Sequence, residues 1–366
     1  MNLRSQQIEL NPNNKQSTLM SQHTGYARVA FNFALSSFKV GLDKDEWRDY
    51  REIKREFNAV KREKFPWCSE LSQNASKNAI HNLGDAVTRW KKGQNNFPVY
   101  KRRDGKCSYQ ADNGQGTVDV YKKRINLPKI GWIRMREELQ WTGEITKVVV
   151  SKHNGKWYAS ITVRRLDSNN YKHQPLLFDD SKQPIGIDVG INTLATCSDG
   201  TTHENPRPLK RYERKLQRAN RALSRKVYQS KNWYKAKKVL SNVHYRIACI
   251  REDAHHQVST TIVRKASAIG IETLNISGLL KNRTLAKALS DSALSRFLRM
   301  LKYKAERRGI PITQADQFFA SSKTCSNCGH KKKYLMLSDR VYNCLKCGFT
   351  CDRDLNAAIN LCPTPT

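Results

Sequence analysis

Four cysteines near the C-terminus have the spacing of a metal site. Cys325 and Cys328 form one Cys-X-X-Cys pair, and Cys344 and Cys347 form a second pair after fifteen intervening residues. Each pair can present two thiolates to the same ion, and four thiolates complete a tetrahedron with no open position. A glycine follows the second cysteine of each pair, where a tight turn needs backbone freedom. The spacing therefore predicts one structural Zn²⁺.

Three acidic residues could hold a different kind of metal. Asp188 lies in an alternating apolar segment between two glycines, Glu272 follows a similar segment, and Asp354 stands at the start of a predicted helix. Carboxylates suit Mg²⁺ or Mn²⁺, and two such ions can activate a water and stabilise the leaving oxygen in phosphodiester cleavage. We expect the neighbouring glycines to leave room for metal and phosphate.

Each acid also has a simpler interpretation. Asp352 or Asp354 could cap the helix that follows. Asp188 could end a strand in a turn, and Glu272 could pair with one of the many basic residues. Spacing alone does not show that the three acids meet in space.

The composition indicates a polyanionic partner. Lys and Arg outnumber Asp and Glu by 66 to 32, which gives a formal net charge of +34 and a pI of about 10.0. Such an excess repels itself unless it is neutralised, and it is typical of nucleic-acid binding. From Arg207 to Arg251 the chain has fifteen Lys or Arg residues and one acid, Glu213, with Tyr and Trp interleaved. A solvated helical face is the alternative to a surface that positions phosphates. The candidate contacts here are Lys210, Arg211, Arg214, Arg218 and Arg221.

The sequence predicts a cytoplasmic protein, associated with the nucleoid of a bacterium or archaeon and without a membrane partner. No apolar run approaches the roughly 20 residues of a spanning helix. Residues 1–15 lack the apolar core of a signal peptide. Ten cysteines in a reducing compartment favour metal binding over disulfides.

Turn signals and apolar periodicity predict the elements that position these residues. A short strand at 7–10 precedes helices over 15–92, the clearest of which has an apolar face from Leu71 to Trp90. Residues 97–166 are rich in β-branched and aromatic residues, and the Asn154-Gly155 dipeptide predicts a hairpin within a small β-barrel. A polar linker follows at 167–183, and from Pro184 on the pattern is that of an α/β domain.

Several motifs together resemble TnpB, a family of RNA-guided nucleases encoded by bacterial insertion sequences and related to type V CRISPR effectors. They are Gly-Ile-Asp-Val-Gly at 186–190, Glu-Thr-Leu-Asn-Ile-Ser-Gly at 272–278, Leu-Ser-Arg-Phe-Leu at 294–298, Ser-Ser-Lys-Thr-Cys-Ser-Asn-Cys-Gly at 321–329 and Asp-Arg-Asp-Leu-Asn-Ala-Ala at 352–358. Segments 25–35 and 127–131 have less specific counterparts, so the similarity spans almost the whole chain. Ala320 departs from the family, which often has Pro there.

The resemblance implies an α+β multidomain fold. A wedge-like β-barrel with an inserted helical recognition domain would precede an RNase H-like (RuvC) nuclease domain with an embedded zinc-ribbon finger. The implied boundaries are barrel strand 1–14, recognition domain 15–95, remainder of the barrel 96–180, nuclease domain 181–318, zinc-finger and target-strand-loading insertion 319–350, and end of the nuclease domain 351–366.

The resemblance also implies the site and its partners. Carried over motif by motif, Asp188, Glu272 and Asp354 are the catalytic, magnesium-binding acids, and the family favours Asp354 over Asp352 for the third place. The partners are a guide RNA from the transposon end and a target double-stranded DNA, and one complete triad per chain permits a monomer on each RNA.

Gln73, Asn74 and Lys77 are candidates for reading the short motif beside the target. They lie close together on a predicted helix in the region that the family uses for this purpose. Asn and Gln can bond adenine edges with two hydrogen bonds. Ordinary exposed helix positions are the alternative.

The sequence thus predicts a metal-dependent, RNA-guided DNA endonuclease of an insertion sequence. One alternative is a nuclease-inactive, RNA-guided DNA-binding regulator, although such relatives lose triad acids and all three are present here. Another is an RNA-independent zinc protein that binds DNA during transposition, which would not copurify with a discrete RNA.

Overall fold

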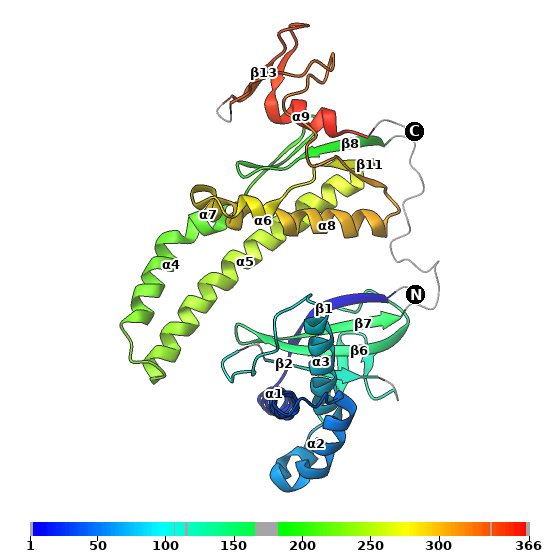
Figure 1. Ribbon diagram of the computed structural model, residues 1–366, viewed down its shortest axis with the longest axis vertical. Coiled ribbons are helices and arrows are strands. Elements are labelled where there is room, and N and C mark those ends of the chain that lie inside the picture. Colours follow the sequence, from blue (N-terminus) through cyan, green and yellow to red (C-terminus); the bar gives the residue numbers. More distant parts are fainter. Residues whose placement is uncertain (1–2, 106, 114–115, 165–181, 337–338, 364–366) are drawn as a thin grey trace. The chain divides into compact units, whose positions relative to one another are not determined.

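The computed structural model describes residues 3–105, 107–113, 116–164, 182–336 and 339–363. The chain forms two compact units, Met1–Lys172 and His173–Thr366 (Figure 1). Each unit has its own apolar core. Most of the linker predicted at 167–183 lies outside the described residues. No helix in the described ranges is long and apolar enough to cross a membrane.

The first unit is built on a seven-stranded sheet. Its strand order is β2-β6-β7-β1-β5-β4-β3, with every neighbouring pair antiparallel. The strands are β1 (Leu3–Asn11), β2 (Cys107–Asp112), β3 (Asp119–Tyr121), β4 (Arg124–Leu127), β5 (Gly131–Met135), β6 (Glu144–His153) and β7 (Lys156–Arg164). Among the described strands no pairing joins β2 to β3, so closure into a barrel stays a prediction.

The hairpin predicted at Asn154-Gly155 is present between β6 and β7. Both residues have positive φ, 48° and 82°, as the two central residues of a type I′ turn require. His153 pairs with Lys156 across this turn. The turn therefore fixes the register of the two longest paired strands, which places Val148 and Val150 in the core.

The first unit also contains helices, of which the first and third α-helices pack on this sheet and the second packs on those two helices. They are α1 (Asn14–Asp43), α2 (Tyr50–Lys64), the short 3₁₀ helix η1 (Pro66–Glu70) and α3 (Gln73–Lys91). Helix α1 begins at a reciprocal cap, in which Asn13 and Gln16 each bond the other's backbone N–H. The apolar face predicted from Leu71 to Trp90 is that of α3, which packs against α1.

The second unit has a five-stranded mixed sheet in the order β10-β9-β8-β11-β12. Strands β8, β11 and β12 are parallel, whereas β9 and β10 run antiparallel to their neighbours. The strands are β8 (Gln183–Asp188), β9 (Thr193–Cys197), β10 (Thr202–Glu204), β11 (Ala266–Ile271) and β12 (Ile312–Gln314). Ile185 and Ile187 of β8 point into the core that the helices below the sheet complete.

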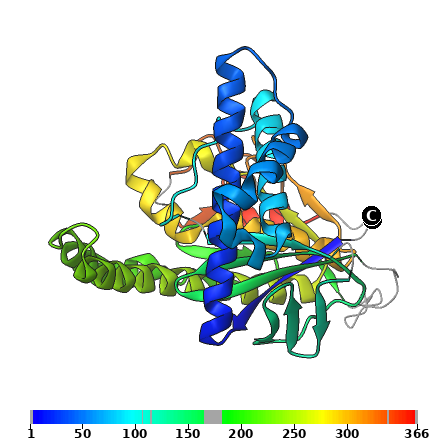
Figure 2. The same ribbon diagram turned by 90° about the horizontal axis from the view of Figure 1, so that it is seen from below.

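The described residues of this unit form six helices, which are α4 (Pro208–Ser224), α5 (Lys231–Lys265), α6 (Ile276–Leu279), α7 (Arg283–Ser292), α8 (Leu294–Arg307) and α9 (Arg353–Leu361). Helices α5 and α8 cover one face of the sheet and α9 covers the other (Figure 1). Helices α4 and α5 pack side by side as a long hairpin (Figure 2). A two-stranded ribbon, β13 (Val341–Asn343) and β14 (Thr350–Asp352), leads directly into α9.

Candidate functional site

Two of the predicted acids, Asp188 and Glu272, lie at the same edge of the five-stranded sheet. Asp188 is the last residue of β8, and Glu272 directly follows β11. The two strands are parallel neighbours with Ile187 opposite Ile271, so both acids lie at the carboxyl ends of paired strands. Such edges are where open α/β sheets place their ligand sites.

The third acid arrives on α9, which lies directly against the strands. A Cβ added to Gly186 would overlap the carbonyl oxygen of Ala358, and one added to Gly270 would overlap that of Leu361. The expectation that the glycines leave room for metal and phosphate was therefore wrong for these two positions, because helix backbone fills the space. Their function is to let α9 approach the sheet, and this docking brings Asp354, in the first turn of α9, to the acidic edge.

Burial and like charge perturb the acids strongly. Burial raises the pKa of Asp188 to about 8. The nearby carboxylates of Glu272, Asp354 and Asp352 raise this pKa further, whereas Arg353 opposes them. Burial also raises the pKa of Glu272 to about 7. Each ionised carboxylate is costly here because it has lost water and faces other acids. A buried group with such a shift beside specific charged neighbours is typical of a functional site.

Asp352 and Asp354, the two rivals for the third position, have different contacts. The Asp352 carboxylate caps α9, accepting hydrogen bonds from the backbone N–H of Asp354 at 2.9 Å and of Leu355 at 3.0 Å. The Asp354 carboxylate instead pairs with Arg353 at 3.1 Å and lies 3.9 Å from Arg340. The capping alternative therefore applies to Asp352.

The three carboxylates are neighbours but are not gathered around one point. In the described parts of the chain, the group of metal-ligand side chains close enough to hold one ion is the set of four cysteines. The two arginines at Asp354 supply positive charge to the acidic cluster. Oxygen donors of this kind fit Mg²⁺ or Mn²⁺ chemically.

The four cysteines have the geometry of a closed tetrahedral site. Their sulfur atoms all lie within 4.8 Å of one another, with Cys325 3.8 Å from Cys347 and Cys328 3.6 Å from Cys344. A tetrahedron with Zn–S bonds of about 2.3 Å has sulfur atoms about 3.8 Å apart. The arrangement thus fits a structural zinc ion and offers no open position for a substrate.

Each cysteine pair is held by a similar backbone turn. Gly329 N–H donates to the Cys325 carbonyl at 2.9 Å, and Gly348 N–H donates to the Cys344 carbonyl at 3.0 Å. Both glycines have positive φ, 73° and 71°. The glycine requirement inferred from the sequence is confirmed at both turns.

Helix α9 is bonded to the cysteine segment as well as to the sheet. The fully buried Asn356 side chain accepts from Ser326 N–H at 3.0 Å and donates to the Thr324 carbonyl at 2.7 Å. Asn360 donates to the carbonyls of Ser321 at 2.8 Å and Thr324 at 2.7 Å. These bonds connect the first cysteine turn to the helix that carries Asp354.

The five basic candidates all lie exposed on α4. Lys210, Arg214, Arg218 and Arg221 follow one another at intervals of three or four residues and so share one face of the helix, and Arg211 lies beside them. No ion pair within the described residues involves any of the five. Their charge is therefore available to an external anion.

The other three candidates lie at the start of α3 and are partly engaged within the protein. Gln73 accepts from Lys61 Nζ at 3.0 Å, Asn74 donates to the Asp112 carbonyl at 3.4 Å, and Lys77 lies 3.5 Å from the Asp112 carboxylate. Gln73 and Lys77 are exposed and Asn74 is half-buried. A role for them in reading DNA stays a prediction.

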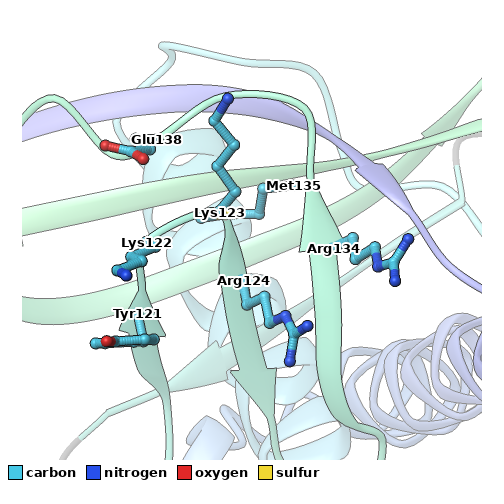
Figure 3. A pocket seen from close by; sticks show the side chains of 7 residues that line it. All are labelled: Tyr121, Lys122, Lys123, Arg124, Arg134, Met135 and Glu138. Carbon is cyan, nitrogen blue, oxygen red and sulfur yellow. The ribbon is translucent and has the colours of Figure 1, made fainter.

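Sequence reasoning missed a basic pocket in the first unit (Figure 3). It has a volume of about 600 Å³ and is lined by Tyr121, Lys122, Lys123, Arg124, Arg134, Met135 and Glu138. Arg124 of β4 is directly opposite Arg134 of β5, although like charges at such a position destabilise a sheet. Only the strand register reveals this pair, so no sequence motif could have shown it.

Comparison with known proteins identifies the family. A family model described as "Probable transposase" matches residues 173–283, and one described as "Cas12f1-like, TNB domain" matches 295–361. A Streptomyces pristinaespiralis relative, "Putative RNA-guided DNA endonuclease", is 31% identical over 96% of this chain and 86% of its own length. The chain belongs to the TnpB family. The resemblance drawn from the motifs is thereby confirmed.

The chain is also similar to a second curated relative and to a solved structure. The Escherichia coli K12 protein "Putative RNA-guided DNA endonuclease InsQ" is 29% identical over 98% of this chain and 91% of its own length. A solved structure, "Cryo-EM structure of the Cas12f1-sgRNA-target DNA complex", is 14% identical over 99% of each chain, with a TM-score of 0.38.

A third family model, described as "Helix-turn-helix domain", matches residues 1–40. In this structure the described part of that segment is strand β1 followed by the single continuous helix α1. The segment therefore contains no helix-turn-helix within its described residues.

Proposed function

We propose that this TnpB-family chain is an RNA-guided DNA endonuclease that cuts double-stranded DNA beside a short motif, with Asp188, Glu272 and Asp354 as its metal-binding catalytic acids. The observation that carries the proposal is the convergence of three acids from β8, β11 and α9 at one sheet edge, where Glu272 and Asp354 help to raise the pKa of Asp188. The names of the relatives agree with this activity.

The protein's own contribution is to hold carboxylates at fixed positions. Asp188 and Glu272 adjoin paired strands of the sheet, and Asp354 is fixed by the docking of α9. Two divalent ions, when bound there, supply an activated water and a stabilised leaving oxygen. Arg340 and Arg353 neutralise part of the acidic charge at Asp354, which lowers the cost of keeping the acids close together.

The proposed domain layout follows the same family. Residues 181–318 and 351–366 would form the RuvC-type nuclease domain around the zinc-finger insertion at 319–350. Residues 1–14 and 96–180 would form the wedge barrel, and residues 15–95 the recognition domain. The guide RNA and the target DNA would neutralise the net charge of +34, with the α4 residues and the pocket of Figure 3 among the phosphate contacts.

The test is cleavage by the full chain with the RNA that copurifies from its own locus. A plasmid library with randomised flanks, incubated with Mg²⁺, reports both the adjacent motif and the cut. Asp188→Asn, Glu272→Gln and Asp354→Asn remove charge with little change of shape, and each is expected to abolish cleavage while guided binding persists.

Asp352→Asn is the matched control for Asp354→Asn. Asn caps a helix about as well as Asp, so this variant keeps the cap of α9 and should cleave. Full activity in any of the three triad variants would refute that residue's role. Guided binding without cleavage by the unaltered chain would instead identify a nuclease-inactive regulator.

A further inference from the structure

The connection between α4 and α5 carries an exposed aromatic cluster. The Tyr228 and Trp233 rings lie 5.0 Å apart at an interplanar angle of 74°, and the Trp233 and Tyr234 rings lie 5.1 Å apart at 84°. Tyr228 is 67% exposed and Tyr234 54%. The two tyrosine rings are exposed at the end of the helical hairpin, and Trp233 between them is half-buried. Large rings exposed together in this way are typical of an interaction surface.

The cluster is surrounded by positive charge. Exposed basic residues precede it in the turn and follow it along α5: Arg225, Lys226, Lys231, Lys235 and Lys238. The Lys237 ammonium lies 4.8 Å from the centre of the Trp233 ring. The sequence from 214 to 251 contains no Asp or Glu, so neither helix supplies an acid near the turn. Basic side chains around exposed rings match the chemistry of a phosphate backbone carrying bases.

The turn itself is defined by local contacts. Gln229 has a φ of 63°, a left-handed conformation that is uncommon for a residue other than glycine. Ser230 caps α5 by accepting a hydrogen bond from the Trp233 backbone N–H at 3.1 Å. These contacts fix the backbone at Trp233 and keep the neighbouring tyrosines at the end of the hairpin.

We propose that this hairpin tip, residues 225–238, binds single-stranded nucleic acid by stacking unpaired bases on Tyr228 and Tyr234. Charge favours a nucleic acid over a second protein surface. Exposed ring faces favour unpaired bases, since bases within a duplex are already stacked on one another. The tip uses none of the three acids, so its binding is a second activity beside the proposed cleavage.

The test measures binding of the full chain to oligonucleotides without guide or Mg²⁺. Fluorescence anisotropy compares single-stranded DNA, single-stranded RNA, an abasic strand of equal length and a blunt duplex. Tyr228→Ala with Tyr234→Ala removes two stacking positions and should weaken binding of both single strands at least about thirtyfold, since each stacked base contributes at least about 1 kcal/mol. Binding of the abasic strand should be unchanged by this double variant.

Two further variants separate stacking from charge. Tyr228→Phe with Tyr234→Phe keeps the rings and should retain affinity. Replacing Lys231, Lys235 and Lys238 with Gln should reduce the slope of log affinity against log salt, whereas the Ala variant should leave that slope unchanged.

Three results would overturn the proposal: unchanged affinity in the Ala variant, equal weakening on the abasic strand, or dimers in light scattering that the Ala variant dissociates. The last result would identify a self-association surface instead. Because this binding needs no cleavage, an inactive triad would leave the test intact. If the tyrosine replacements weaken binding of single-stranded RNA and DNA unequally, the more strongly affected strand is the one that stacks on the tyrosines.

Discussion

The cysteine cluster and the acidic cluster represent two ways of building a metal site in one unit. The cysteines come from two short turns within 23 residues, and their sulfur atoms already lie within 4.8 Å of one another. The acids come from two strands and a helix spread over residues 188–354, and they are not gathered in this way. Local turns can arrange soft ligands directly, whereas distant carboxylates depend on the whole fold and repel one another.

The two sites are nevertheless connected. Asn356 and Asn360 bond α9 to the first cysteine turn, while Gly186 and Gly270 let the same helix lie against the sheet. The position of Asp354 at the start of α9 therefore depends on both the bonds to the cysteine turn and the contact with the sheet. If this connection positions Asp354, loss of the cysteine site should also lower cleavage at the acidic site.

Removing the zinc ligands should have the largest effect. Cys325→Ser with Cys344→Ser is expected to unfold residues 319–350, because structural zinc contributes roughly 10–16 kcal/mol in small finger peptides. Cleavage should fall to background, since α9 loses its bonds to the first turn. Metal analysis and the plasmid cleavage assay measure the two effects. Normal cleavage by a zinc-free variant would show that the finger is an appendage.

Adding a methyl group beneath α9 should have the next largest effect. Gly270→Ala forces its Cβ against the Leu361 carbonyl, and overpacking of this kind costs about 1–3 kcal/mol. We expect reduced cleavage with normal zinc content and a lower melting temperature. Gly25→Ala is the control, since a Cβ there meets nothing within 4 Å. Wild-type cleavage by Gly270→Ala would contradict the close docking of α9.

Breaking the bond network between the two sites should have a smaller effect. Asn356→Ala leaves the Thr324 carbonyl and the Ser326 N–H without this partner, at a cost of about 1–3 kcal/mol. Cleavage should fall while zinc content stays at one ion per chain. Asn343→Ala changes an exposed residue of β13 and should affect neither cleavage nor zinc content. If Asn356→Ala loses zinc, the asparagine stabilises the zinc site itself, and its role is not limited to positioning α9.

The smallest predicted effect concerns the core below the sheet. Burial lowers the pKa of His255 to about 4, with Arg251 and Arg296 lowering it further and Glu252 opposing them. The folded protein therefore prefers neutral His255, and its stability falls as pH drops below the ordinary histidine value of about 6.5. This group should remove about 1 kcal/mol of unfolding free energy between pH 8 and pH 6.

Denaturant titration of His255→Leu at both pH values measures this contribution. The variant should lose that share of the pH dependence. An unchanged pH dependence in His255→Leu would show that the histidine titrates as freely as in the unfolded chain. Zinc content should stay constant in either case. A constant zinc content would show that the change in stability arises in the core around His255 and not in the zinc site.

The cysteine site was visible in the sequence because its ligands and glycines are local. The three acids could be assigned only through the resemblance to TnpB, since periodicity places each acid on its own element but does not bring the elements together. Strand order and parallel pairing of β8 with β11 then explain why Asp188 and Glu272 share an edge.

Other features depend on contacts that no spacing encodes. The glycines at 186 and 270 were interpreted as space for a ligand, yet helix backbone fills that space. The separate roles of Asp352 and Asp354 depend on rotamers and on Arg340, fourteen residues before Asp354. The opposed arginines of the pocket appear only once the register of β4 and β5 is known.

The backbone-to-backbone contact of α9 has a consequence for engineering variants of this protein. Where side chains fill the space between two elements, directed evolution can enlarge one side chain and shrink its neighbour, which restores the packing. At residues 186 and 270 there is no side chain to exchange, so these positions offer no compensating mutation. Libraries aimed at higher activity should hold both glycines constant and place their diversity on exposed positions, such as those of the α4–α5 hairpin.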